Sequence, residues 1–115
     1  MRDRPGQGLE QQLNEAVAAV WERRRDQVMD RVGVLVRAAA LLHEGASPEM
    51  APEVTAKAKD EAHRLAGLLG SFGFHEGSAI AAEIEELLSQ APGGYEWIDR
   101  LGSKVIALNT YMGAR

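Results

Sequence analysis

The chain has 115 residues, 45% of them hydrophobic, which is enough for a single domain with one core and no need of metal or cross-links. It contains no cysteine, so disulfides, cysteine-ligated zinc and thiol catalysis are excluded. Its net charge is −4, with acidic and basic residues interspersed, which argues against a nucleic-acid-binding surface.

The N-terminal stretch MRDRPGQGLEQQ carries charges but no apolar segment, so it does not form a secretory signal. We expect residues 1–8 to be flexible and residues 9–115 to form the folded domain. No apolar run approaches the roughly 18 residues of a membrane span. We therefore expect no membrane insertion and a cytoplasmic protein. The length fits either a complete small protein or one domain of a longer one.

Strand signals are nearly absent, and the first helical tract is expected from about Leu9 to His43. Its apolar residues are separated by three or four positions, with one gap of eight, which predicts one core-facing stripe: Leu13, Val17, Val20, Val28, Val32, Leu35, Ala39 and Leu42. Arg24 interrupts this stripe within WERRRD, so the tract is either two helices or one helix with a bend. Gly45 is expected to end it.

The second helix is expected to begin near Pro52, which suits the first turn of a helix, and to end between Leu69 and Phe72. The Gly-containing segment 70–77 forms the next turn. The second helix has an apolar stripe that we expect in the core: Val54, Ala58, Ala62, Leu65, Leu69 and Phe72.

A third helix is expected from about Glu76 to Gln90, and the APGG sequence at 91–94 breaks the chain after it. The fourth helix should run from about Tyr95 to Met112. Trp21 and Trp97 occupy helical positions that we expect to face the core. Amphipathic helices joined by short loops predict an all-α antiparallel bundle.

His63 lies on the face of the second helix that points away from the apolar stripe, so its side chain should face water. Its neighbours on the helical wheel are small, apart from one lysine: Ala56, Lys59, Ala66, Gly67 and Gly70. A glycine inside a helix costs about 1 kcal/mol relative to alanine, so another requirement must favour it. The glycines provide either clearance for a partner or close packing within the bundle.

The stretch AHRLAGLLGSFGF resembles the core motif of the histidine phosphotransfer (HPt) domain. The matching residues are His63, Leu65, Gly67, Gly70, Ser71, Phe72, Gly73 and Phe74. GSFGF is similar to the turn in the phosphotransfer domain of chemotaxis histidine kinases, and the similarity continues to Ile84–Glu85. The preceding VWERRRDQVMDRVGVLVRAAALL resembles the helix before the motif in bacterial members, so the likeness covers most of the chain.

The resemblance implies a four-helix bundle in which His63 accepts a phosphoryl group from a receiver-domain aspartate or a histidine kinase and passes it on. The protein would be a transfer intermediary rather than a turnover enzyme. It would need no cofactor of its own, because the receiver partner supplies the Mg²⁺. Glu85 matches the glutamate that orients the histidine ring in chemotaxis-type domains. The implied docking surface comprises Lys59, Arg64, Ala66, Gly67, Gly70 and Ser71.

Ala66 departs from the family pattern, which usually has a lysine at this position. Lys59 or Arg64 is expected to supply the missing charge. Two other readings stay open: a docking module that binds a receiver domain without carrying phosphate, and a purely structural bundle. Glu85 also has a plainer reading, as one of three acids in EIEE on a solvated helix face.

The other candidate residues have simple structural explanations. We expect His43 at a helix end and His75 in a loop, and neither belongs to a metal-binding motif such as HExxH. The acids at 83, 85 and 86 are expected on a solvated face. The run Arg23–Arg25 either lies on a solvated face or binds a phosphate or an acidic partner.

Overall fold

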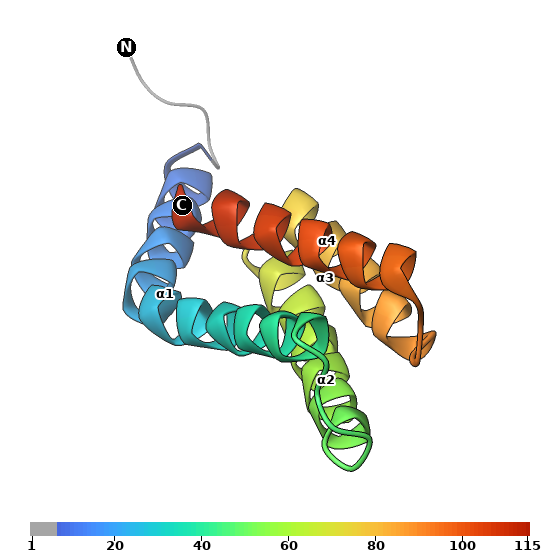
Figure 1. Cartoon of the computed structure of the whole chain (residues 1–115). Coiled ribbons are helices and arrows are strands. Elements are labelled where there is room, and N and C mark those ends of the chain that lie inside the picture. The colour runs from blue at the N-terminus through green and yellow to red at the C-terminus, as the bar shows by residue number, and fades with distance from the viewer. Residues whose placement is uncertain (1–6) are drawn as a thin grey trace.

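The computed structural model describes residues 7–115, which form four helices and no strand. They are α1 (Gln7–His43), α2 (Ala51–Ser71), α3 (His75–Ser89) and α4 (Tyr95–Gly113). Each helix packs against the next along the chain, and α4 returns to pack against α1 (Figure 1). The predicted all-α four-helix bundle is confirmed. Residues 1–6 of the expected flexible segment lie outside the described residues, and Gly8 already belongs to α1.

The core is built from the apolar stripes of all four helices. The stripe of α2 is buried in its central part, and Val54 and Phe72 at its two ends are half-buried. Trp97 is also half-buried, and its indole Nε1 donates a 2.6 Å hydrogen bond to the carbonyl of Leu87. The largest fully buried side chains are Leu35, Leu65, Leu69, Ile84, Leu108, Met112, Val28 and Val32.

Glycines in the left-handed backbone region end the first two helices, as expected. Gly45 has φ +84° and follows α1, and Gly73 has φ +82° and follows α2. Only glycine adopts this conformation without strain from a Cβ atom. Backbone N–H groups beyond each glycine bond back to the last turn, from Ala46 to the Leu41 carbonyl and from Phe74 to the Leu69 carbonyl.

The first helix is continuous through WERRRD, so the prediction of one bent helix holds and that of two helices does not. Figure 1 shows this helix changing direction in its light-blue stretch, a little after residue 20. Close to this stretch, Trp21 and Arg25 donate hydrogen bonds to the carbonyls of Arg115 and Gly113. The C-terminal end of α4 is therefore held against α1 at this level.

The expectation that Leu13, Val17 and Val20 face the core is wrong. These side chains are 57%, 46% and 37% exposed, whereas Trp21 is only 7% exposed. The stripe does follow the 3.6-residue period of a helix. However, no other element among residues 7–115 packs against the part of α1 that precedes Trp21. We call residues 7–20 the arm of α1.

Trp21 connects α1 to the turn between α2 and α3, so we expect Trp21→Ala to be strongly destabilising. Its ring packs edge-on against Phe72 and Phe74, with centroids 5.2 and 4.7 Å away. Removal of a buried tryptophan side chain should lower the free energy of unfolding by about 3–5 kcal/mol. Urea denaturation followed by circular dichroism measures this change.

Trp21→Phe is the matched control, because it keeps an aromatic ring and loses the hydrogen bond to the Arg115 carbonyl. That bond is long, at 3.4 Å, and its loss together with the smaller ring should cost about 1–2 kcal/mol. Equal losses for the two variants would contradict the view that ring packing is the main contribution.

Candidate functional site

His63 lies on the solvent side of α2, as the wheel predicts. Its side chain is 73% exposed, while its neighbours Ala62 and Leu65 have no exposed surface. The buried neighbours fix the rotation of α2 about its axis, because turning them outward would remove them from the core. The imidazole is therefore held at the surface by the core packing of the same helix.

The turn after α2 brings α3 back alongside the histidine. Phe72 caps α2, Gly73 takes its positive φ, and the N–H of Ser78 bonds to the carbonyl of Phe74 in the first turn of α3. Glu85, 22 positions after His63 in the chain, consequently lies opposite the imidazole. The sequence separation is bridged by a helical hairpin.

The Nδ1 atom of His63 lies 3.0 and 3.1 Å from the two carboxylate oxygens of Glu85. A carboxylate oxygen accepts hydrogen bonds, so this contact favours the tautomer with the proton on Nδ1. The Nε2 atom then carries the lone pair of the neutral ring. The Glu85 side chain is 28% exposed, less than half the exposure of His63, and it lies next to the fully buried Ile84.

A second contact between α2 and α3 lies one turn beyond the histidine. The hydroxyl of Ser78 donates a 2.6 Å hydrogen bond to the carbonyl of Ala66. A Cβ atom at Gly70 would lie 3.3 Å from that hydroxyl oxygen, which is tighter than ordinary van der Waals contact. Gly70 is half-buried and permits this close approach of the helices.

Gly67 differs from Gly70, although the two looked alike in sequence. Among residues 7–115, no atom other than those of its two chain neighbours and its own helical backbone lies within 4 Å of the position of its missing Cβ, and the residue is exposed. Close packing within the bundle therefore does not explain this glycine. Packing against α3 explains Gly70, whereas the surface above Gly67, beside His63, is open.

The two candidate cations near His63 have different surroundings. Arg64 is ion-paired with Asp60 on its own helix at 3.1 Å and lines a cleft on the α1 side, together with Arg24 and Arg31. Lys59 is exposed, and no ion pair holds it among residues 7–115. Since the His63 ring turns toward α3, Arg64 is directed away from it.

Of the other predicted docking residues, Ala66 is half-buried and packs against the core. Ser71 is exposed, and its hydroxyl donates a 3.0 Å hydrogen bond to the carbonyl of Gly67. This is a side-chain bond to the carbonyl one turn earlier, a common arrangement for a serine within a helix. Gly67, Gly70 and Ser71 thus lie between one turn and just over two turns after His63 along α2.

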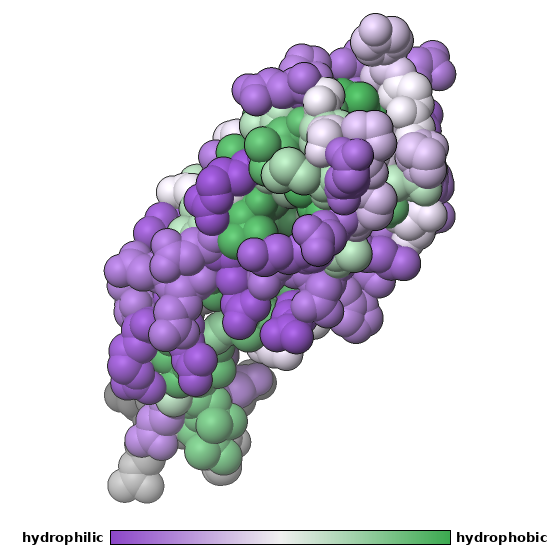
Figure 2. Space-filling view, turned by 60° about the horizontal axis from the view of Figure 1, so that its bottom comes forward, coloured by the Kyte–Doolittle hydropathy of each residue, from purple (hydrophilic) through white to green (hydrophobic). Residues whose placement is uncertain are grey.

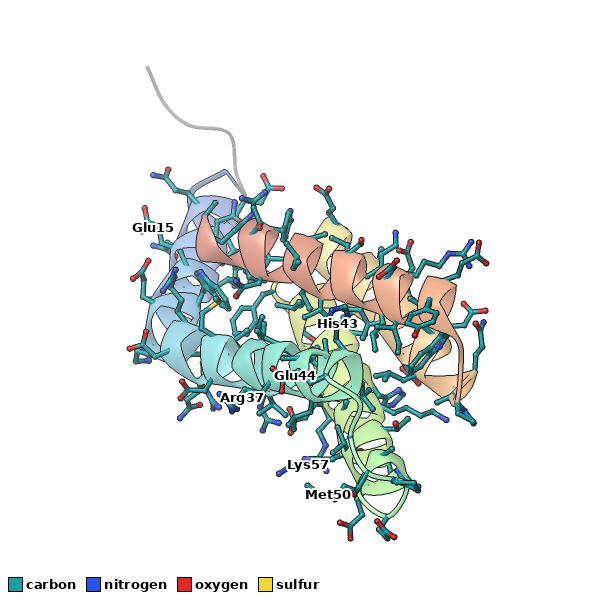
Figure 3. All side chains as sticks on the ribbon, in the orientation of Figure 1. Glu15, Arg37, His43, Glu44, Met50 and Lys57 are labelled. Carbon is teal, nitrogen blue, oxygen red and sulfur yellow. The ribbon has the colours of Figure 1, made fainter. Side chains whose placement is uncertain are left out.

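Among residues 7–115, neither of the other histidines hydrogen-bonds to His63, and of the acids at 83, 85 and 86 only Glu85 does. His43 is exposed at the end of α1 (Figure 3), and His75 begins α3, so its placement in a loop was wrong by one residue. Glu83 forms an ion pair with Lys104 of α4. Within the run Arg23–Arg25, Arg25 bonds to the Gly113 carbonyl.

None of the helices formed by residues 7–115 is long and apolar enough to cross a membrane.

Comparison with models of protein families finds a match to the Hpt domain over residues 7–111. No curated protein and no solved structure matches the chain. The family match spans α1, α2 and α3 and nearly all of α4, and it includes both His63 and Glu85. The chain therefore belongs to the Hpt domain family, whose members act in histidine phosphotransfer in two-component systems.

Proposed function

We propose that this protein accepts a phosphoryl group on Nε2 of His63, from the aspartyl phosphate of a receiver domain or from a histidine kinase, and passes it on in a phosphorelay. The observation that supports this most is the pairing of an exposed imidazole with a carboxylate. The Glu85 carboxylate lies 3.0 Å from Nδ1 of His63, so the other ring nitrogen, Nε2, is the one available to attack phosphorus. Membership of the Hpt family supports the same function.

The reaction is a displacement at phosphorus. The Nε2 lone pair of His63 attacks the phosphorus of the aspartyl phosphate, an N–P bond forms, the acyl O–P bond breaks, and the aspartate carboxylate leaves. The imidazole becomes positively charged, and the Glu85 carboxylate stabilises it by accepting the Nδ1 hydrogen bond. In this proposal the receiver supplies the Mg²⁺, and both partners meet in the cytoplasm.

Glu85 is proposed as a positioning residue, so Glu85→Gln should slow transfer without unfolding the bundle. Glutamine has the same shape, but it carries no charge and can present its N–H₂ group to Nδ1. We expect the rate of phosphoryl transfer from a phosphorylated receiver to fall roughly tenfold or more, as for other imidazole-orienting carboxylates. Single-turnover labelling measures the rate.

Two controls accompany Glu85→Gln. Receiver affinity and thermal unfolding should stay close to the wild type, since glutamine keeps the size and shape of this partly exposed side chain. Glu86→Gln, an exposed acid one position later, should transfer at the wild-type rate. Equal rates for the wild type and Glu85→Gln would remove the orienting role.

We propose that Lys59 supplies the positive charge that the family's usual lysine, replaced here by Ala66, would provide. It lies one turn before His63 on the same side of α2, whereas the Arg64 guanidinium is engaged by Asp60. A cation near the phosphoryl oxygens neutralises charge that develops during transfer. Lys59→Gln should therefore slow transfer by about three- to tenfold, since an exposed charge is screened by solvent.

Lys57→Gln is the matched control for Lys59→Gln. Lys57 is exposed on the same helix and has the same charge (Figure 3). A helix of 3.6 residues per turn places it on a different side from His63. Its substitution should leave the transfer rate unchanged. If both variants slow transfer to the same extent, the net charge of the helix matters and the position of Lys59 does not. If neither slows transfer, Lys59 has no role in it.

The experiment that tests the proposal is labelling by a phosphorylated receiver domain. The wild-type chain should gain a phosphate that is stable in base and lost in acid, as an N–P bond requires. NMR of the imidazole nitrogens should place it on Nε2. No label from any cognate receiver or kinase would overturn the proposal, and a label on Nδ1 would overturn the role given to Glu85.

One observation favours a second function, a docking module that binds a receiver without carrying phosphate. Ala66 stands where the family usually has lysine, and the structure shows its side chain packed at the edge of the core. In that case a receiver would bind with measurable affinity while no acid-labile label forms. Absence of both binding and label would leave the purely structural bundle.

A further inference from the structure

The arm of α1 has an apolar surface that the rest of the described chain leaves uncovered. All residues from 8 to 20 are exposed, and the apolar side chains among them include Leu9 at 60%, Leu13 at 57% and Val17 at 46%. Figure 2 shows hydrophobic side chains gathered at the end of the molecule where the chain continues into the grey residues. Contiguous apolar patches on a surface commonly mark interaction sites.

These side chains are arranged as a seam. Leu9, Leu13, Ala16 and Val20 are separated by four, three and four positions, the spacing of the a and d positions of a coiled coil. Val17 lies beside this seam. A 14-residue helical segment extends about 21 Å, and a helix of that length is only marginally stable in water by itself. A second helix that covers the seam would stabilise the arm.

The charges along this part of α1 favour a particular partner. The arm carries Glu10 and Glu15 and no basic residue, whereas Arg23–Arg25 follow shortly after it between Glu22 and Asp26, in a segment with a net charge of +1. Glu15 points away from the bundle in Figure 3. An identical helix in antiparallel orientation would set the acidic part of one copy beside the basic part of the other. A parallel copy would set like charges side by side.

We propose that the arm pairs in antiparallel orientation with the arm of a second copy of this chain. Leu13 of each copy then faces Val20 of the other, Ala16 faces Val17, Glu10 lies near Arg23, and Leu9 lies beside the aliphatic part of the Arg24 side chain. The four-helix bodies extend from opposite ends of the paired arms. His63 and Glu85 lie outside the arm, so each dimer carries two phosphotransfer sites that the pairing does not use.

The first test measures the oligomeric state of the full chain across the micromolar range by sedimentation velocity. The wild type should be a dimer, and Leu13→Glu with Val17→Glu should weaken dimerisation by roughly a hundredfold or more, because each substitution enters the interface twice. Both positions are exposed, so circular dichroism should show a folded bundle. A monomeric wild type would overturn the proposal.

Ile106→Glu is the matched control, since Ile106 is an exposed apolar residue, at 67%, on α4. This variant should stay dimeric. If it dissociates while the variant of Leu13 and Val17 does not, the copies meet through the α1–α4 face and the arm is not the interface.

The second test uses the absence of cysteine from the chain to determine orientation. A mixture of Leu13→Cys and Val20→Cys chains should form a mixed disulfide in a thiol redox buffer. Leu13→Cys alone should not, because antiparallel pairing separates its two copies by about 10 Å along the axis. Efficient cross-linking of Leu13→Cys with itself and no mixed product would show a parallel pair and overturn the proposal. These measurements need no phosphate, so they do not depend on the phosphotransfer function.

Discussion

His63→Gln is expected to accept no phosphoryl group, with labelling at background under conditions that label the wild type fully. Glutamine has no basic nitrogen that could attack phosphorus, although its amide can still donate a hydrogen bond to Glu85. Because the native side chain is 73% exposed, the stability of the variant should stay within about 1 kcal/mol of the wild type. Quantification of acid-labile phosphate after incubation with a phosphorylated receiver measures the loss.

The chain provides its own controls, since it contains two other histidines. His43 and His75 are exposed at helix ends, so His43→Gln and His75→Gln should label like the wild type. Full labelling of His63→Gln would assign the acceptor to another residue. Normal receiver binding by His63→Gln, measured at the same time, would show that the lost label reflects lost chemistry and not lost docking.

Gly67→Arg is expected to separate docking from folding, with effects of opposite sign. The missing Cβ position has no neighbour within 4 Å, so an arginine side chain fits the free protein. Replacement of a helical glycine should raise the free energy of unfolding by up to about 1 kcal/mol. On the face beside His63 the same side chain should obstruct a receiver and lower its affinity at least about tenfold, or 1.4 kcal/mol.

Gly102→Arg controls for the gain in helix propensity. Gly102 also has open space at its Cβ position, and it lies in α4, which does not pack against α2 among the described residues. It should gain similar stability and keep full receiver affinity. Gly70→Arg is a poorer test, because its Cβ would press on the Ser78 hydroxyl that joins α2 to α3. Unchanged receiver affinity in Gly67→Arg would contradict the clearance argument.

Much of this fold can be predicted from the sequence because the signals are local. The glycines at 45 and 73 end helices through their own backbone conformation, and the helix bounds depend on such signals together with the apolar period. Periodicity identifies the face of a helix that can be buried, but burial also requires a neighbouring element. That is why the stripe of α1 predicts Val28 and Val32 correctly and fails for Leu13 and Val17.

For the site too, features set within one helix could be predicted from the sequence, whereas contacts between helices could not. The exposure of His63 is a consequence of helical geometry in α2. Its contact with Glu85 was expected only through the likeness to a family, since the hairpin sets which residues of α3 face α2. The bond from Ser78 to the Ala66 carbonyl was missed, because a single serine in a helix carries no pattern. The engagement of Arg64 by Asp60 fits the four-residue spacing of the pair and could have been predicted.

The packing of Trp21 against the GSFGF turn gives the protein a built-in fluorescent reporter. The indole contacts Phe72 and Phe74, which directly follow the helix that carries His63. The chain has only two tryptophans, so Trp97→Phe leaves Trp21 as the only tryptophan, which excitation beyond the tyrosine absorption band selects. Any event that shifts the end of α2 relative to α1 should change its emission. Partner binding and phosphorylation could thus be followed in real time on an otherwise unlabelled chain.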